Sequence, residues 1–171
     1  GKWNYQKSNI AIKLMVKVLV KKLNPKVQLP SYKTDGSSGM DLLAFINNPV
    51  IIKPGTSELI PTGISIAIPS NFEIQIRPRS GLAAKSSISV LNTPGTIDSD
   101  YRGEIKIILF NHGEKEFIVN NNDRVAQMVL MPISKVEFNE VDKLPNTLRG
   151  EGGFGSTGKW NISLIIVLLK D

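Results

Sequence analysis

Hydrophobic residues along this chain recur mainly at every second position, the spacing that puts side chains on one face of a β-strand. The clearest example is Phe72, Ile74 and Ile76, which alternate with polar residues. A second alternating stretch covers residues 59–68, and residues 15–20 follow a similar pattern. Each stretch predicts a strand with one buried face.

Residues 105–110 and 124–131 are instead hydrophobic at nearly every position, which is typical of strands buried on both faces. Proline and glycine separate the hydrophobic stretches, as in residues 53–55, and predict turns. Residues 81–85 are the exception, because they favour a single helical turn. Short strands between frequent turns predict an all-β sandwich or barrel without an internal domain boundary.

Composition adds to this interpretation. The 171 residues are 41% hydrophobic and 21% charged, which suits one domain with a buried core. The absence of cysteine excludes disulfides and thiolate chemistry and fits an intracellular, cytoplasmic protein. The single histidine, His112, stands between an asparagine and a glycine, where we expect a structural turn residue and no zinc site.

The net charge of +6 is concentrated at the two ends of the chain. Residues 15–158 carry 16 basic and 14 acidic residues, a net charge of only +2. A nucleic-acid-binding module is expected to carry a basic stripe with interleaved aromatic residues, and only 6% of the residues are aromatic. We therefore expect no nucleic-acid partner.

The ends share the sequence Gly-Lys-Trp-Asn, at residues 1–4 and 158–161. The hydrophobic stretch 162–169 is too short to span a bilayer, and no segment resembles a signal peptide. We expect residues 1–14 and 159–171 to be extensions of uncertain role outside a folded domain of residues 15–158, without a membrane partner. The tail is either an extra strand or a non-native extension.

Three polar clusters carry the candidate chemistry. In residues 77–83, two arginines two positions apart precede a Ser-Gly step that opens the short helix, an arrangement suited to binding phosphate. The alternative is a helix cap beside two solvated arginines. In residues 92–104, a Pro-Gly turn places Asp98 at the end of a predicted hairpin, next to Tyr101. The Tyr101 ring would cover a base or sugar, or else be a core aromatic.

The third cluster, residues 149–158, contains five glycines in ten residues. Such a segment loses much conformational entropy on ordering, so we expect a mobile arm when no ligand is bound. Phe154 is suited to stacking on a base, and Arg149, Ser156 and Thr157 are suited to phosphates. The alternative is a flexible tail.

Five segments, in order, resemble the five motifs of the homotrimeric dUTP pyrophosphatase family: residues 38–42, 77–85, 92–104, 124–128 and 149–158. The resemblance implies a distorted jelly-roll-like β-barrel and a trimer with three shared active sites. Each site would take its second and fourth motifs from one chain, its first and third from another and its arm from the third. The thirteen residues after Gly158 depart from the family pattern.

The resemblance also implies roles in the hydrolysis of dUTP to dUMP and pyrophosphate, which keeps uracil out of DNA and supplies dUMP for dTMP synthesis. Asp98 would be the general base, and Mg²⁺ would accompany the triphosphate, touching Asp41 only through water. Phosphates would be held by Arg79, Ser80, Gly81, Gln127, Arg149, Ser156 and Thr157. Uracil would be selected by Asn92, Gly95, Thr96, Ile97 and Lys106 under Phe154, with Tyr101 against the sugar.

Asp100 and Glu104 would have structural roles, pairing with Arg102 or with neighbouring chains. Two other functions stay open: a dCTP deaminase of the same fold, and a binding or regulatory module that uses the nucleotide as a signal. Ammonia release from dCTP would favour the deaminase. The motif around Asp98 and the Phe-Gly-Ser-Thr arm favour triphosphate hydrolysis.

Overall fold

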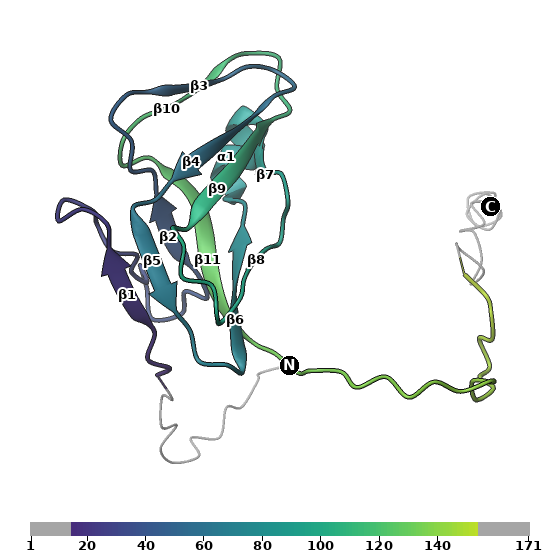
Figure 1. The fold of residues 1–171 in the computed structure, drawn as a ribbon. Helices are drawn as coiled ribbons and strands as arrows, with labels where there is room; N and C mark the ends of the chain where they lie inside the picture. The colour runs from purple at the N-terminus through teal and green to yellow at the C-terminus, as the bar shows by residue number, and fades with distance from the viewer. Residues whose placement is uncertain (1–14, 154–171) are drawn as a thin grey trace, which may run out of the picture. The chain divides into compact units, whose positions relative to one another are not determined.

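The computed structural model describes residues 15–153, which fall into two units. Residues 15–134 form a compact unit of eleven strands and one short helix (Figure 1). Residues 135–153 belong to a second unit and contain no helix or strand. The elements are β1 (Leu19–Lys22), β2 (Met40–Leu43), β3 (Val50–Ile52), β4 (Ser57–Pro61), β5 (Ile64–Ala67), β6 (Phe72–Arg77), α1 (Ser80–Ser86), β7 (Ile88–Val90), β8 (Gly95–Ile97), β9 (Lys106–Asn111), β10 (Phe117–Val119) and β11 (Arg124–Pro132).

Every strand pairing in the first unit is antiparallel. One sheet has the order β2-β11-β6-β8 and another the order β4-β9-β7, and two pairs, β1-β5 and β3-β10, complete the set. Most neighbours in a sheet are far apart in sequence, as in a jelly roll. The all-β prediction is therefore confirmed.

The core consists mainly of isoleucine, leucine and valine from these strands. On β6, Ile74 and Ile76 are buried while the polar residues on either side of them are half-exposed, which confirms the alternation predicted for this strand. On β9, the alternate positions Ile108 and Phe110 are only half-buried. The prediction that β9 is buried on both faces is wrong for this chain, because β9 covers the core with one face only.

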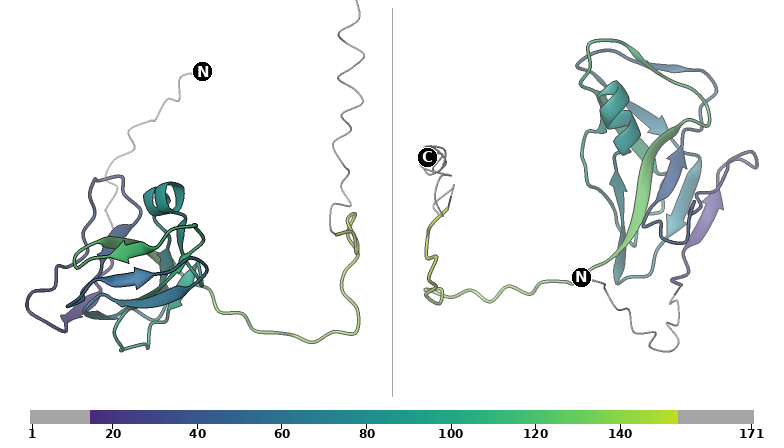
Figure 2. Two further views of the ribbon diagram at one scale, coloured as in Figure 1. Left: turned by 90° about the horizontal axis from the view of Figure 1, so that it is seen from above. Right: turned by 180° about the vertical axis from the view of Figure 1, so that it is seen from behind.

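Helix α1 begins after Arg79, whose backbone is extended, and ends at Ser87, whose backbone is left-handed with φ of 54°. This seven-residue helix confirms the helical turn predicted around residues 81–85. It lies beside β7 at the edge of the unit, at the side away from β1 (Figures 1 and 2). The strand predicted at residues 15–20 is shifted to β1 and is exposed throughout.

None of the helices within residues 15–153 is long and apolar enough to cross a membrane.

Candidate functional site

The carboxylate of Asp41 joins three of the predicted motifs within one chain. Asp41 lies on β2, and its Oδ1 accepts a hydrogen bond from Arg79 Nε at 2.8 Å. Its Oδ2 lies 3.4 Å from Arg124 Nη1, at the start of β11. Arg79 Nη1 also donates to the Arg124 carbonyl oxygen, at 3.1 Å. The strand pairing of β2 with β11 produces this cluster, because it sets the two elements side by side.

The expected division of motifs between chains is therefore wrong for the first motif. The resemblance placed the first motif in a different chain from the second and fourth. In the structure, Asp41 of the first motif forms ion pairs with Arg79 of the second and Arg124 of the fourth, all in the same chain.

Gln127 holds the backbone just before Arg79. It stands opposite Arg77 and Asp41 in the strand ladders, and its Nε2 donates to the Pro78 carbonyl oxygen at 2.9 Å. Gly39 makes room for this side chain, because a Cβ at that position would lie 2.7 Å from Gln127 Oε1. The segment that leads into α1 is therefore fixed from β11.

Ser80 and Gly81 form the exposed first turn of α1. The Arg79 carbonyl accepts hydrogen bonds from the N–H groups of Leu82 and Ala83, so the N–H groups of Ser80 and Gly81 come before the first intrahelical donors. A Cβ on Gly81 would meet nothing within 4 Å, which leaves open space at this turn. The predicted phosphate-binding residues Arg79, Ser80 and Gly81 are thus adjacent in the chain and accessible to a ligand at the surface.

Asn92, Gly95, Thr96 and Ile97 lie on or beside β8, which is the edge strand of the four-stranded sheet. Its partner is β6, with Gly95 opposite Ile76 and Ile97 opposite Ile74. β7, the strand before it, belongs to a different sheet and pairs with β9. The strands on either side of residues 92–104, β7 and β9, pair with each other, which confirms the predicted hairpin, whereas β8 within that segment pairs with β6 in another sheet.

An edge strand offers backbone N–H and C=O groups along its free side. The Asn92 side chain folds against this strand, since a Cβ on Gly95 would come within 3.2 Å of Asn92 Nδ2. The edge of β8 and the amide of Asn92 are thus available together for hydrogen bonds to a planar ligand such as a base.

Asp98 and Tyr101 share the loop after β8. Asp98 is exposed, and its backbone carbonyl accepts a hydrogen bond from Tyr101 N–H at 3.2 Å. The Tyr101 hydroxyl donates to the Glu104 carbonyl oxygen at 3.0 Å, and its ring lies against Gly103. Tyr101 as a residue is 44% exposed, so it is anchored at its hydroxyl but is not a core residue.

Glu104 is structural, but its partner differs from the expected one. Its Oε1 accepts a hydrogen bond from Gly63 N–H at 2.8 Å, and its Oε2 lies 3.8 Å from Lys106 Nζ. Arg102 instead donates to the backbone carbonyls of Ser99 and Tyr101. Of the two expected partners of Glu104, Arg102 is therefore wrong, and a neighbouring chain stays a prediction.

Strand register separates Asp98 from Arg79 within one chain. Ile97 stands opposite Ile74, so Asp98 comes level with Glu73 at the start of β6, whereas Arg79 follows the end of β6. Arg79 lies six positions after Glu73, which corresponds to roughly 20 Å of extended chain. The candidate base and the candidate phosphate-binding arginine thus lie at opposite ends of the β6-β8 ladder.

The side chains of this site suit a metal ion only if a bound ligand supplies most of the atoms that coordinate the metal. Within residues 15–153 no group of three or more His, Cys, Asp or Glu side chains is placed to hold a metal. Asp41 already accepts from two arginines. Mg²⁺ keeps several waters and binds through substrate phosphates and one or two carboxylates, which fits this arrangement.

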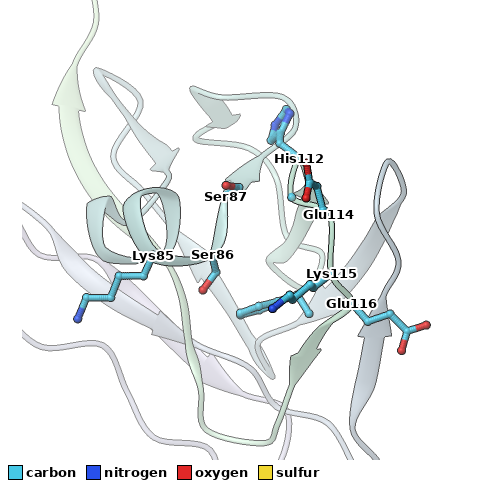
Figure 3. A pocket seen from close by; sticks show the side chains of 9 residues that line it. Lys85, Ser86, Ser87, His112, Glu114, Lys115 and Glu116 are labelled. Atoms are coloured by element: carbon cyan, nitrogen blue, oxygen red, sulfur yellow. The ribbon is translucent and has the colours of Figure 1, made fainter.

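A further hollow on the described surface lies away from these residues. It has a volume of about 550 Å³ between the end of α1 and the segment that joins β9 to β10 (Figure 3). His112, Ser87 and Lys115 are among its lining residues. His112 Nε2 is hydrogen-bonded to Ser89 Oγ at 2.8 Å, and the structural role expected for this histidine stays a prediction. None of the predicted site residues lines this hollow.

The glycine-rich arm is described only at its start. Arg149 Nε donates to the Gly152 carbonyl oxygen at 2.8 Å, in a turn in which Gly150 has φ of 52°. Phe154, Ser156 and Thr157 lie outside the described residues, so their predicted roles are not addressed by the structure.

Arg124 is the residue of this site that the sequence analysis did not select. The sequence feature that could have identified Arg124 is its position at the start of a hydrophobic strand, in the same motif as Gln127. Only the pairing of β2 with β11 brings Arg124 to Asp41.

Comparison with known proteins agrees with the family resemblance. The dUTPase family model matches residues 25–158. The deoxyuridine 5'-triphosphate nucleotidohydrolase of Rickettsia bellii is 55% identical over 145 residues, covering 84% of this chain and 97% of the relative. The enzyme of that name from Maricaulis maris is 56% identical over 132 residues, covering 76% of this chain and 87% of the relative.

Solved structures show the same fold. The dUTPase of Staphylococcus bacteriophage 80alpha with dUpNHpp superposes with a TM-score of 0.72 at 23% identity, covering 84% of this chain and 99% of the phage protein. A mutant dUTPase of the same phage gives a TM-score of 0.74 at 23% identity, over 82% and 98% of the two chains. From the family match and the identity to these relatives, the chain belongs to the dUTPase family.

Proposed function

We propose that this protein hydrolyses dUTP to dUMP and pyrophosphate. The observation that carries the proposal is identity of 55% to a deoxyuridine 5'-triphosphate nucleotidohydrolase along 97% of that relative. By this reaction the protein keeps uracil out of DNA and supplies dUMP for dTMP synthesis, in the cytoplasm. The residues of the site suggest how each part of the substrate is handled.

The triphosphate binds at the start of α1. Arg79 has five N–H donors, of which those on Nε and one on Nη1 are used within the described chain. The remaining donors, with the N–H groups of Ser80 and Gly81, stabilise phosphate oxygens. The orientation of this segment is supported by Gln127, whose amide is bonded to Pro78.

The uracil base binds along the free edge of β8. Backbone groups of Gly95 to Ile97 and the Asn92 amide supply the donor and acceptor pattern that uracil requires. Cytosine would leave buried polar groups of the site unpaired, which discriminates strongly between bases. The close contact of Gly95 with Ile76 and Asn92 leaves little space for a thymine methyl group. The exposed face of Tyr101 lies against the sugar and excludes a 2′-hydroxyl.

Asp98 acts as the general base for the water that attacks the α-phosphorus. The Asp98 side chain is exposed and directly follows β8, the strand whose edge binds the base. A carboxylate is a modest base, so most of the acceleration comes from positioning the water and neutralising charge. Mg²⁺ would supply neutralisation of the phosphate charge, and Asp41 would be the residue that holds it, through water.

A complete site needs more than one chain. Asp98 and Arg79 lie at opposite ends of the β6-β8 ladder, so one chain cannot supply both to the same α-phosphorus. A closed trimer, in which Asp98 of one chain meets Arg79 of the next, solves this geometry. The arm, residues 149–158, then closes over the nucleotide with Arg149, Phe154, Ser156 and Thr157 and excludes bulk solvent while the attacking water stays bound.

Pyrophosphate release from dUTP, dTTP, dCTP and UTP, each with and without Mg²⁺, tests this function. Release from dUTP alone, in the presence of Mg²⁺, is the expected result. Ammonia release from dCTP would instead identify a deaminase. Binding of all nucleotides without release, even after removal of residues 159–171, would identify a binding or regulatory module.

A further inference from the structure

Both oxygens of the Asp41 carboxylate contact an arginine side chain. Its side chain is 17% exposed, and the short bond to Arg79 Nε, at 2.8 Å, is the more enclosed of the two, with Arg79 at 22% exposure. Arg124 contributes the longer contact, at 3.4 Å, and its side chain is 54% exposed. Because solvent weakens exposed ion pairs, the bond to Arg79 dominates.

Arg79 is attached at two points that come from two different strands. Asp41 on β2 accepts from its Nε, and the backbone carbonyl of Arg124 on β11 accepts from its Nη1. A guanidinium is a rigid planar fork, so two such bonds fix the direction of its free donors. Without Asp41, one attachment would remain, and the side chain would lose more conformational entropy when it bound a phosphate.

The surroundings do not supply a substitute for Asp41. Arg79 and Arg124 line an open pocket of about 300 Å³ with Leu82 and Asp123. The Asp123 carboxylate is occupied in its own turn, where Oδ2 accepts from Asn120 N–H at 2.7 Å. Asp123 therefore adds negative charge near the pocket but forms no ion pair with either arginine within the described residues.

We propose that Asp41 is a positioning residue for Arg79, which it orients toward the substrate triphosphate. The inference rests on the proposed function and adds a role to the water-mediated contact with Mg²⁺. It has a distinct consequence: Asp41 contributes to phosphate binding in the absence of Mg²⁺, and its contribution passes through Arg79.

A double-mutant cycle tests this consequence with dUpNHpp as the probe, in EDTA. Asp41→Asn keeps the size of the side chain but removes its charge. Arg79→Lys keeps the positive charge but lacks the fork and the Nε–H group. Asp41→Asn should weaken dUpNHpp binding about tenfold in the otherwise unaltered protein, since a charged hydrogen bond is lost. In the Arg79→Lys protein the same change should weaken binding by less than about twofold.

Two controls separate positioning from a general loss of structure. Binding of deoxyuridine, which has no phosphate, should be unaffected by Asp41→Asn. Glu58→Gln, which removes a carboxylate from the exposed side of β4 in another sheet, should leave dUpNHpp binding unchanged.

An equal loss of dUpNHpp binding in both backgrounds would overturn the proposal, as would a loss that requires Mg²⁺ or one that extends to deoxyuridine. The proposed function is judged separately, from hydrolysis of dUTP by the unaltered protein. If hydrolysis were absent, the function would be wrong, and the binding cycle would still decide the role of Asp41.

Discussion

Gln127 Nε2 donates a hydrogen bond of 2.9 Å to the carbonyl oxygen of Pro78, the residue just before Arg79. This bond ties the end of β6 to β11 at the point where the chain enters α1. The phosphate-binding segment is therefore held by strand pairing and one amide, and not by the seven-residue helix alone.

Gln127→Glu should weaken substrate binding, because a carboxylate oxygen would replace the donor and face the Pro78 carbonyl. We expect KM for dUTP to rise roughly tenfold, the effect of one broken, partly buried hydrogen bond. Steady-state kinetics measure the change. Gln28→Glu, at an exposed position, is the matched control and should leave KM unaltered. A normal KM in Gln127→Glu would remove this residue from the site.

Asp98→Asn should reduce kcat by about a thousandfold, within the range for loss of a general base, while dUpNHpp still binds. Asp100→Asn, two residues further along the same exposed loop, is the control and should retain activity. Single-turnover kinetics and calorimetry give the two quantities. Asp98 would not be the base if kcat were unchanged.

Mixing two inactive proteins should restore activity if Asp98 and Arg79 of one site come from different chains. When Asp98→Asn and Arg79→Gln chains are co-refolded at equal ratio, a randomly assembled cyclic trimer keeps about a quarter of its sites intact. We therefore expect about a quarter of the unaltered kcat per site, measured by pyrophosphate release. Each protein refolded alone is the control. Absence of recovery in verified mixed trimers would contradict the shared site.

Gly103→Ala should destabilise the loop after β8, because the added Cβ would overlap the Tyr101 ring. Overpacking of this kind costs about 1–3 kcal/mol of unfolding free energy. Gly36→Ala is the control, since a Cβ there meets nothing within 4 Å. Denaturant unfolding gives the stability. If Tyr101 excludes the 2′-hydroxyl, hydrolysis of UTP should also rise relative to dUTP; an unchanged ratio would argue against that role.

Truncation before Arg149 should abolish efficient hydrolysis while leaving the oligomeric state intact, because the arm contributes to the closed site and not to the folded core. Phe154→Ala should give a smaller loss, from the missing stacking on the base. Removal of residues 159–171 alone is the matched control. Light scattering and pyrophosphate release distinguish assembly from catalysis, and full activity of the truncated protein would exclude arm closure.

The sequence by itself determined the all-β class, the alternation on β6, the helical turn after Arg79 and the five ordered motifs of the family. These features depend on local spacing and on residue type, both of which are visible along the chain. The structure separately describes residues 15–134 as a compact unit, while the predicted domain limits at 15 and 158 stay predictions.

Only the tertiary structure decided which motifs meet. The pairing of β2 with β11 brings Asp41 to Arg79 and Arg124, and the pairing of β8 with β6 places β8, which lies inside the β7-β9 hairpin, in another sheet. Strand partners in this fold are far apart in sequence, and a two-residue periodicity fixes the face of a side chain but not its partner strand. For that reason the sequence could name Asp98 and Arg79 but could not place them at opposite ends of one ladder.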